Sequence, residues 1–98
     1  MRLTQKQQKA IKDIFLDTFQ KGEIYLFGSR VDDTKRGGDI DLYIVLEKRP
    51  SISIIFNKKI DFLVKLKEKI GEQKIDVVIS KDKNRSIEQE ALKNGIKL

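Results

Sequence analysis

The sequence contains no cysteine and no histidine. Without cysteine, disulfides and thiolate metal sites are excluded, and a reducing compartment is the natural location. Without histidine, Ser-His-Asp chemistry is excluded. Any proton transfer by this chain must therefore fall to a carboxylate, a lysine, a tyrosine or metal-bound water.

Long apolar runs are missing as well. The first residues contain no apolar stretch of signal-peptide length, and no later stretch approaches a membrane span. The 98 residues leave room for one domain, residues 1–98, with one modest core. We therefore expect a soluble, cytoplasmic protein without a second substrate-binding domain, in which a surface loop or another polypeptide recognises the acceptor substrate.

Basic residues outnumber acidic ones, with 21 Lys and Arg against 15 Asp and Glu and a net charge of +6. This balance suits phosphorylated ligands, nucleic acid or an acidic protein partner. The lysines are dispersed among glutamates in helical stretches such as 65–69, a pattern typical of a solvated helix face. Charge therefore narrows the class of partner without identifying it.

The first half of the chain predicts one helix and two strands. Thr4 and Gln7 form a capping-box pattern ahead of apolar residues at helical spacing, which continue to Gly22. Two short apolar runs rich in strand formers follow, at 24–27 and 40–46. A polar loop separates these two predicted strands.

The second half predicts helix, strand and helix. Pro50 precedes a helical stripe that stops before Gly71 and consists of Ile55, Phe56, Ile60, Leu63, Leu66 and Ile70. Residues 74–79 read as a strand, and Ser86 with Gln89 forms a capping box for a short terminal helix. The resulting order predicts an α/β (α+β) fold, with a small mixed β-sheet flanked by helices.

The candidate phosphate-binding and metal-binding residues lie at the end of the first predicted strand and the start of the second. Gly28 and Ser29 follow the first strand, and nine residues later Asp39 and Asp41 open the second. Glycine lets a phosphate approach the backbone closely, and serine adds a hydroxyl and a main-chain N–H. The two aspartates project from the same side of their strand and would repel each other without a divalent cation. Protein carboxylates combined with substrate phosphates are typical of bound Mg²⁺.

Asp76 is a third carboxylate, inside an otherwise apolar strand where a charge is costly unless it is paired or bound to a metal. If its strand lies beside that of Asp39 and Asp41, the three carboxylates could hold two Mg²⁺ ions about 4 Å apart, as in-line phosphoryl or nucleotidyl transfer requires. The alternative is an Asp at a strand edge with its carboxylate in water. The upstream pair favours the metal site.

The Gly28-Ser29 pair, the nine-residue spacing and Asp39-Ile40-Asp41 at the start of a strand resemble the signature of the DNA polymerase β-like nucleotidyltransferase superfamily. Length and element order resemble its minimal nucleotidyltransferase proteins. The resemblance implies the polymerase β-like nucleotidyltransferase fold over most of the chain, with ATP as substrate and Mg²⁺ as cofactor.

The resemblance also implies roles for particular residues. Gly28 and Ser29 would hold the β- and γ-phosphates of ATP, with Arg30 as a further contact. Asp39, Asp41 and Asp76 would be the metal ligands and catalytic residues, and Asp76 could help to deprotonate the attacking hydroxyl. Family members of this size often carry an Arg-Gly step soon after Gly-Ser, where this chain has Val31-Asp32-Asp33. The resemblance therefore assigns no role to Asp32 or Asp33.

Minimal nucleotidyltransferases resemble antitoxins that pair with a helical HEPN-domain ribonuclease and silence it by transferring AMP to a tyrosine. The resemblance thus implies a Mg²⁺-dependent protein adenylyltransferase. Two alternatives stay open: a binding-only antitoxin or scaffold with a vestigial site, and nucleotidyl transfer to a small molecule. Nucleic acid is not expected as a direct ligand, because no basic and aromatic platform for stacked bases is evident. The oligomeric state, homomeric or heteromeric, is left open.

Overall fold

The computed structural model describes residues 3–28, 39–48 and 50–98. Its helices and strands are α1 (Gln5–Phe19), β1 (Glu23–Phe27), β2 (Ile40–Val45), α2 (Ile52–Ile70), β3 (Ile75–Ile79), α3 (Ser86–Asn94) and β4 (Ile96–Lys97). The order of the six predicted elements is confirmed. Only β4 was missed, because two residues are too few to show a period.

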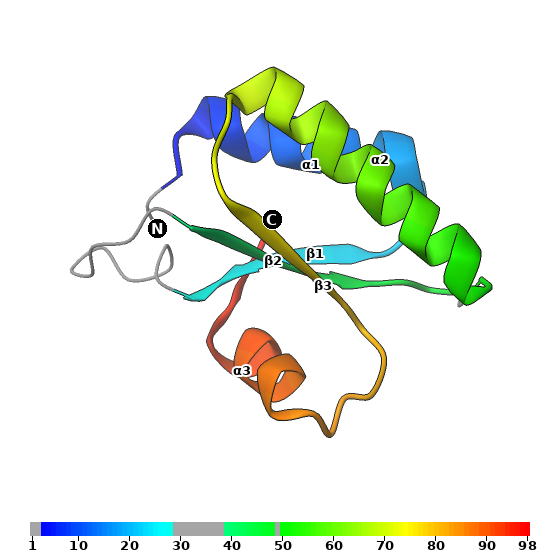
Figure 1. Ribbon diagram of the computed structural model, residues 1–98. Helices are drawn as coiled ribbons and strands as arrows, with labels where there is room; N and C mark the ends of the chain where they lie inside the picture. Colours follow the sequence, from blue (N-terminus) through cyan, green and yellow to red (C-terminus); the bar gives the residue numbers. More distant parts are fainter. Residues whose placement is uncertain (1–2, 29–38, 49) are drawn as a thin grey trace.

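The strands form one mixed sheet in the order β3-β2-β1-β4. β1 runs antiparallel to both β2 and β4, whereas β2 and β3 are parallel and joined through α2. Helices lie on both faces of this sheet: α1 and α2 side by side on one, and the short α3 on the other (Figure 1). The predicted α/β (α+β) class, a small mixed sheet flanked by helices, is confirmed.

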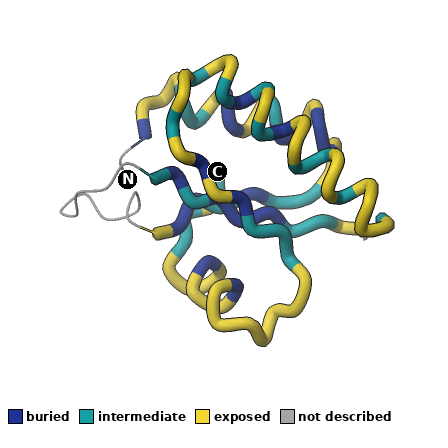
Figure 2. The backbone as a smooth tube through the Cα atoms, in the orientation of Figure 1, coloured by how far each residue is buried: buried dark blue, intermediate teal, exposed yellow. Residues whose placement is uncertain are grey.

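The larger part of the core lies between the sheet and the α1/α2 layer, where alternate residues of β2, Ile40, Leu42 and Ile44, are fully buried. The opposite face of β2 carries Asp41 and Tyr43, and Tyr43 belongs to a smaller cluster beneath α3. Burial therefore follows the sheet, and the exposed residues follow the outer sides of the helices (Figure 2). The period-two alternation of a strand places Asp41 on the face that α3 only partly covers.

The helix starts show which capping predictions hold. Thr4 and Gln7 form the predicted capping box, with both hydrogen bonds at 3.0 Å. α3, in contrast, has Arg85 at its N-cap position without a side-chain cap, so the prediction of a Ser86–Gln89 capping box is wrong. The reason is tertiary: the first turn of α3 directs the buried Glu88 carboxylate at the preceding loop.

α2 is buried only in its second half. Its fully buried residues are Phe62 and Leu66, whereas Phe56 and Ile60 of the predicted stripe are 59% and 45% exposed. The Phe62 ring packs against that of Phe19 in α1, with centroids 6.0 Å apart. The first half of α2 thus presents apolar side chains that the described core does not use.

None of the helices in residues 3–28, 39–48 and 50–98 combines the length and apolar character needed to cross a membrane.

Candidate active site

Strand register brings the predicted site residues to one end of the sheet, which we call the aspartate end. Phe27, the last residue of β1, is paired with Asp41, so Gly28 follows directly beside that aspartate. Asp41 is in turn paired with Asp76 of the parallel strand β3. The sequence-based condition that the Asp76 strand lie beside the Asp39–Asp41 strand is therefore met.

Gly28 occupies a position that only glycine fits. Its φ of +77° lies in the left-handed region, and a Cβ built there would collide with the Asp41 carboxylate. The turn after β1 thus holds its backbone directly against the Asp41 carboxylate, an approach that a side chain at this position would prevent. Ser29 and Arg30, the other predicted nucleotide-binding residues, lie outside the described residues, as do Asp32 and Asp33.

Asp41 is an aspartate of this end whose pKa is shifted by its neighbours. Burial raises the pKa of its carboxyl group, and the negative charges of Asp76 and Asp39 raise this pKa further. The positive charge of Lys74 lowers the pKa of Asp41. The negative charge of Glu90 on α3 raises it by a smaller amount. Deprotonated Asp41 therefore stands among like charges, a situation that a cation would relieve.

Asp39 has a counter-ion of its own. The Lys74 Nζ lies 3.5 Å from Asp39 Oδ2, and both side chains are largely exposed. The backbone reinforces this contact, because the Ile40 N–H donates to the Lys74 carbonyl oxygen at 3.0 Å. Of the three aspartates, Asp39 and Asp41 are partly buried and Asp76 is exposed.

Carboxylate oxygens suit a hard divalent cation such as Mg²⁺, and the strand register places Asp41 beside Asp76. Within the described ranges, however, no three acidic side chains are gathered closely enough to hold a metal ion. The backbone positions are in place, and the carboxylates would have to turn toward a common point. The resident cofactor would thus be Mg²⁺ coordinated by Asp39, Asp41 and Asp76.

Sequence reasoning missed two charged residues at the aspartate end, Lys74 and Glu90. Lys74 could have been found, because it precedes Asp76 by two residues and so projects from the same side of the strand. Glu90 gives no such signal. It acts on Asp41 only because α3 packs across the sheet, a long-range placement that local sequence does not encode.

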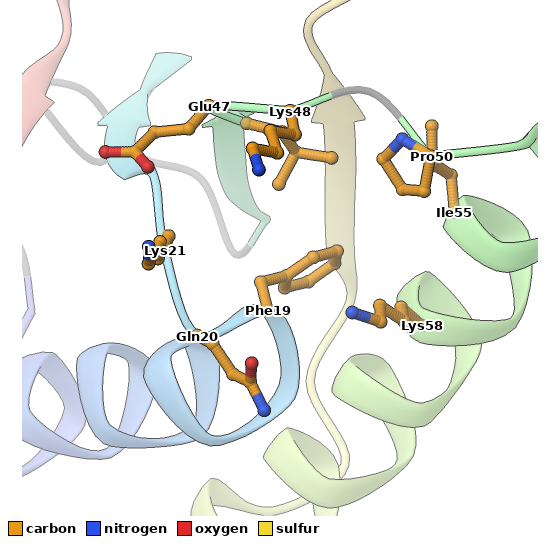
Figure 3. A pocket seen from close by; sticks show the side chains of 9 residues that line it. Phe19, Gln20, Lys21, Glu47, Lys48, Pro50, Ile55 and Lys58 are labelled. Atoms are coloured by element: carbon orange, nitrogen blue, oxygen red, sulfur yellow. The ribbon is translucent and has the colours of Figure 1, made fainter.

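A sizeable cavity lies away from the aspartate end. A hollow of about 510 Å³ is found at the opposite end of the sheet, between the ends of α1 and β2 and the start of α2. Figure 3 shows Phe19 at its floor, with Lys21, Lys48 and Lys58 around it. Among the described residues that line the hollow, Glu47 is the one carboxylate. We therefore assign the candidate active site to the aspartate end, which carries Gly28 and the three predicted aspartates, and not to this hollow.

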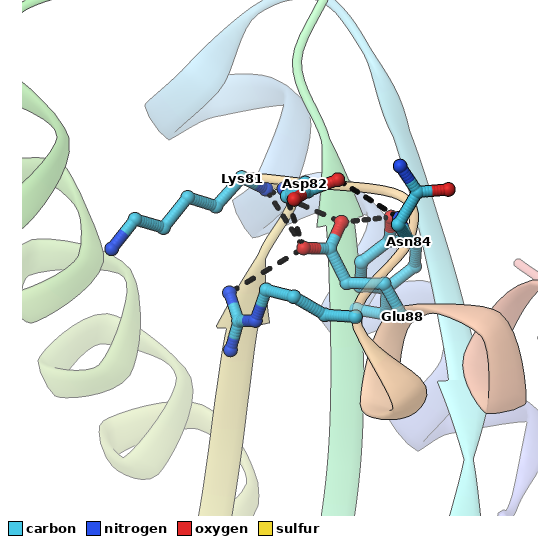
Figure 4. A network of polar contacts seen from close by, with 6 residues as sticks. Lys81, Asp82, Asn84 and Glu88 are labelled. Carbon is cyan, nitrogen blue, oxygen red and sulfur yellow. Dashed lines mark hydrogen bonds and ion pairs between the residues drawn. The ribbon is translucent and has the colours of Figure 1, made fainter.

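A second carboxylate centre, around Glu88, has a different character. Glu88 is fully buried and accepts hydrogen bonds from the Tyr43 hydroxyl at 2.8 Å and from the N–H groups of Lys81 and Asp82 at 3.1 and 2.8 Å. The Arg85 guanidinium adds an ion pair at 3.4 Å. Figure 4 shows Glu88 beside Lys81 and Asp82 of the preceding loop. Both oxygens of this carboxylate accept hydrogen bonds, which tie α3 to β2 through Tyr43 and to the loop before the helix through Lys81 and Asp82.

The pKa values of the Asp41 and Glu88 carboxyl groups also shift in opposite directions. Burial alone would raise the pKa of the Glu88 carboxyl group, but the hydrogen bonds from Asp82, Tyr43 and Lys81 outweigh burial and hold it at about 2. Glu88 is therefore ionised at neutral pH and has no spare capacity for a ligand. It is a structural group.

Comparison with known proteins identifies the class to which this geometry belongs. The family model for "Polymerase beta, Nucleotidyltransferase" matches residues 9–98. The chain therefore belongs to the polymerase β nucleotidyltransferase family, and the resemblance inferred from Gly28-Ser29 and Asp39-Ile40-Asp41 is confirmed. No curated protein matches the sequence.

A solved structure agrees with the family assignment at the level of the fold. A chain from the crystal structure of a mutant of the toxin-antitoxin MntA-HpeT is similar, with a TM-score of 0.67 and 19% sequence identity. The similarity covers 93% of the present chain and 70% of the other. At this identity the likeness establishes the polymerase β-like nucleotidyltransferase fold.

Proposed function

We propose that this protein is a Mg²⁺-dependent adenylyltransferase that transfers AMP from ATP to a tyrosine hydroxyl of a helical HEPN-type toxin and so acts as its antitoxin. The observation that carries the proposal is the register that pairs Asp41 with Asp76 and sets Gly28 against Asp41. Family membership supports nucleotidyl transfer, and the fold shared with a toxin-antitoxin protein supports the choice of partner. Residues 1–98 would act as a single minimal domain in the cytoplasm.

In the proposed reaction, the phenolic oxygen of the acceptor attacks the α-phosphorus of ATP. The new O–P bond forms as the bond to the bridging oxygen of the β-phosphate breaks, and pyrophosphate leaves. Asp76, exposed at the edge of the sheet, would accept the phenolic proton. Mg²⁺ bound by the three aspartates would neutralise the triphosphate and the charge that develops on the leaving group.

The remaining residues would position the nucleotide. Because Gly28 has no side chain, a phosphate would be able to approach the backbone there. Ser29 and Arg30 would contact the β- and γ-phosphates. Catalysis of this kind depends mainly on positioning and charge stabilisation, so a small domain suffices.

The test uses the protein product of the neighbouring reading frame as acceptor. The purified chain, ATP and Mg²⁺ are incubated with this product, and mass spectrometry should detect the added mass of one or more AMP groups on a tyrosine. The Asp76→Asn variant should bind the product in a pull-down but leave it unmodified. A product that is neutralised equally by wild type and Asp76→Asn, and is never modified, would instead establish a binding-only antitoxin.

A second experiment distinguishes nucleotidyl transfer to a small molecule from transfer to a protein. Pyrophosphate release from ATP, measured with the neighbouring product absent and a panel of aminoglycosides present, should stay at the background level. Release that depends on an aminoglycoside would replace the protein acceptor with a small one.

A further inference from the structure

The first half of α2 carries a stripe of exposed apolar side chains. Its members are spaced four residues apart and follow one side of the helix, and they are Ile52 at 83%, Phe56 at 59%, Ile60 at 45% and Val64 at 52% exposure. Residues at this spacing are neighbours on a helix surface. A continuous apolar ridge of this kind is costly to leave in water and is typical of an interaction surface.

A groove lies directly beside this ridge. It has a volume of about 370 Å³ and separates α2 from β3, which is an edge strand of the described sheet. Ile52, Ile55 and Phe56 form its helical wall, and Val77, Val78 and Ile79 form its strand wall. Ridge and groove together make one apolar surface, which we call the α2–β3 groove.

The polar residues of the α2–β3 groove all carry the same sign of charge. Among the described residues that line it, Lys59, Lys81 and Arg85 are basic and none is acidic, and the Arg85 guanidinium also pairs with the buried Glu88. A second copy of this chain, docked symmetrically, would bring these cations against one another at an interface that excludes water. The chain as a whole is also positive, at +6. The charge pattern therefore disfavours self-association and calls for an acidic occupant.

We propose that the α2–β3 groove is the docking site for an acidic, amphipathic segment of a different protein. Aromatic or aliphatic side chains of that segment would fill the space between Phe56 and Val77, and its Asp and Glu residues would face Lys59, Lys81 and Arg85. Apolar anchors would supply most of the affinity, and the rim charges would supply selection against basic partners.

The position of the α2–β3 groove fits a docking role. β3 begins at Ile75 beside the aspartate end and runs away from it, so the groove walls at 77–79 and the start of α2 lie toward the opposite end of the sheet (Figure 1). A partner seated there would leave Gly28 and the aspartates open to a nucleotide. This inference does not depend on nucleotidyl transfer, because it concerns binding alone.

The experiment selects binders from a random twelve-residue peptide display library on the immobilised full chain. The enriched peptides should combine aromatic or aliphatic residues with Asp and Glu. Their affinity is then measured by fluorescence polarisation against the double variant Ile52→Ser/Phe56→Ser, with Leu16→Ser as the control, because Leu16 is 44% exposed on α1. We expect the double variant to lose about tenfold or more in affinity and the control to match wild type.

A charge-reversal pair tests the rim. Lys59→Glu should weaken the same peptides by several-fold, and Lys6→Glu, which makes the same change in net charge on an exposed part of α1, should not. Circular dichroism confirms that each variant is folded.

Three results would overturn the proposal: no enrichment of any peptide family, enrichment of basic peptides, or binding that Ile52→Ser/Phe56→Ser leaves intact. Vesicles of phosphatidylserine and phosphatidylcholine provide the competing arm. Saturable vesicle binding that the double variant abolishes, with no acidic peptide enriched, would assign the surface to an anionic membrane instead.

Discussion

Asp41 and Glu88 are both shielded carboxylates on the α3 side of the sheet, yet their environments are opposite. Glu88 is surrounded by donors, from the Tyr43 hydroxyl to the N–H groups of Lys81 and Asp82, and its pKa is held at about 2. Asp41 is partly buried among other carboxylates, and its pKa is raised. The fold therefore surrounds one carboxylate with hydrogen-bond donors and the other with like charges.

The two environments correspond to two roles, a structural role for Glu88 and a candidate catalytic role for Asp41. A buried charge stabilises a fold only when hydrogen bonds replace its lost hydration. Charges at a catalytic site are instead kept available for metal or substrate, and they reduce stability until that ligand arrives. In this protein the structural carboxylate is on a helix and the candidate catalytic carboxylates are on strands in register.

The largest effect should come from removing the charge of Asp41. Asp41→Asn should reduce nucleotidyl transfer on the order of 10³-fold, because an amide is a poor substitute for a metal-binding carboxylate. Pyrophosphate release with ATP and Mg²⁺ measures this loss. Glu47→Gln, an exposed carboxylate beyond the other end of β2, serves as the control. Near wild-type turnover of Asp41→Asn would remove this residue from the metal site.

Removing Glu88 should instead damage the fold. Glu88→Ala strips the buried hydroxyl of Tyr43 and two backbone N–H groups of their acceptor, which should cost about 2–4 kcal/mol of unfolding free energy. Urea unfolding followed by circular dichroism gives the value. Gln89→Ala, at the exposed neighbouring position, should change stability by no more than about 0.5 kcal/mol. Equal losses in the two variants would mean that the Glu88 network contributes nothing special.

Gly28→Ala should reduce both the stability of the fold and the affinity for ATP, whereas a control glycine variant should reduce stability alone. The change forces a side chain into the left-handed region and against the Asp41 carboxylate, at a cost of about 1–3 kcal/mol. Gly71→Ala is the matched control, because φ there is +95° but a Cβ meets nothing within 4 Å. Both variants should lose stability, and only Gly28→Ala should weaken ATP binding in calorimetry. Unimpaired ATP binding by Gly28→Ala would show that the turn does not receive a phosphate.

The Glu88 network should also give stability a defined acid dependence. Because the pKa of Glu88 in the folded protein, about 2, is below the ordinary value of 4.5, its contribution is complete above about pH 4.5 and is lost as the pH falls toward 2. Thermal melts of wild type and Glu88→Gln across this range should converge at the acid end. A constant difference between them down to pH 2 would contradict the low pKa.

The smallest effect concerns the stability of the Asp41 variant. A raised pKa means that ionisation of Asp41 costs the folded state free energy at neutral pH, so the cost is present above the folded pKa and disappears as the pH falls below it. Asp41→Asn should therefore raise the melting temperature slightly at pH 7, by an amount corresponding to roughly 0.2–1 kcal/mol for a like-charged cross-strand pair. A destabilised variant would mean that Asp41 makes a favourable contact in the folded state.

The sequence alone determined the main elements and half of the candidate site. Thr4 and Gln7 specified a helix start through contacts three residues apart. The alternation of a strand placed Asp41 on the face of β2 opposite to Ile40 and Leu42, with Asp39 directly before the strand. These features depend on near neighbours in the chain, which is why pattern and spacing were enough. The Gly28 turn belongs with them.

Tertiary structure decided the features that depend on distant residues. The pairing of Asp41 with Asp76, the charge of Glu90 near Asp41 and the hydrogen bond from Tyr43 to Glu88 all join residues more than 30 positions apart in the sequence. The exposure of Phe56 has the same origin, since a helix pattern predicts an apolar side but does not say whether another element covers it. Local sequence fixes which way a side chain projects, but only the packed fold fixes what it meets there.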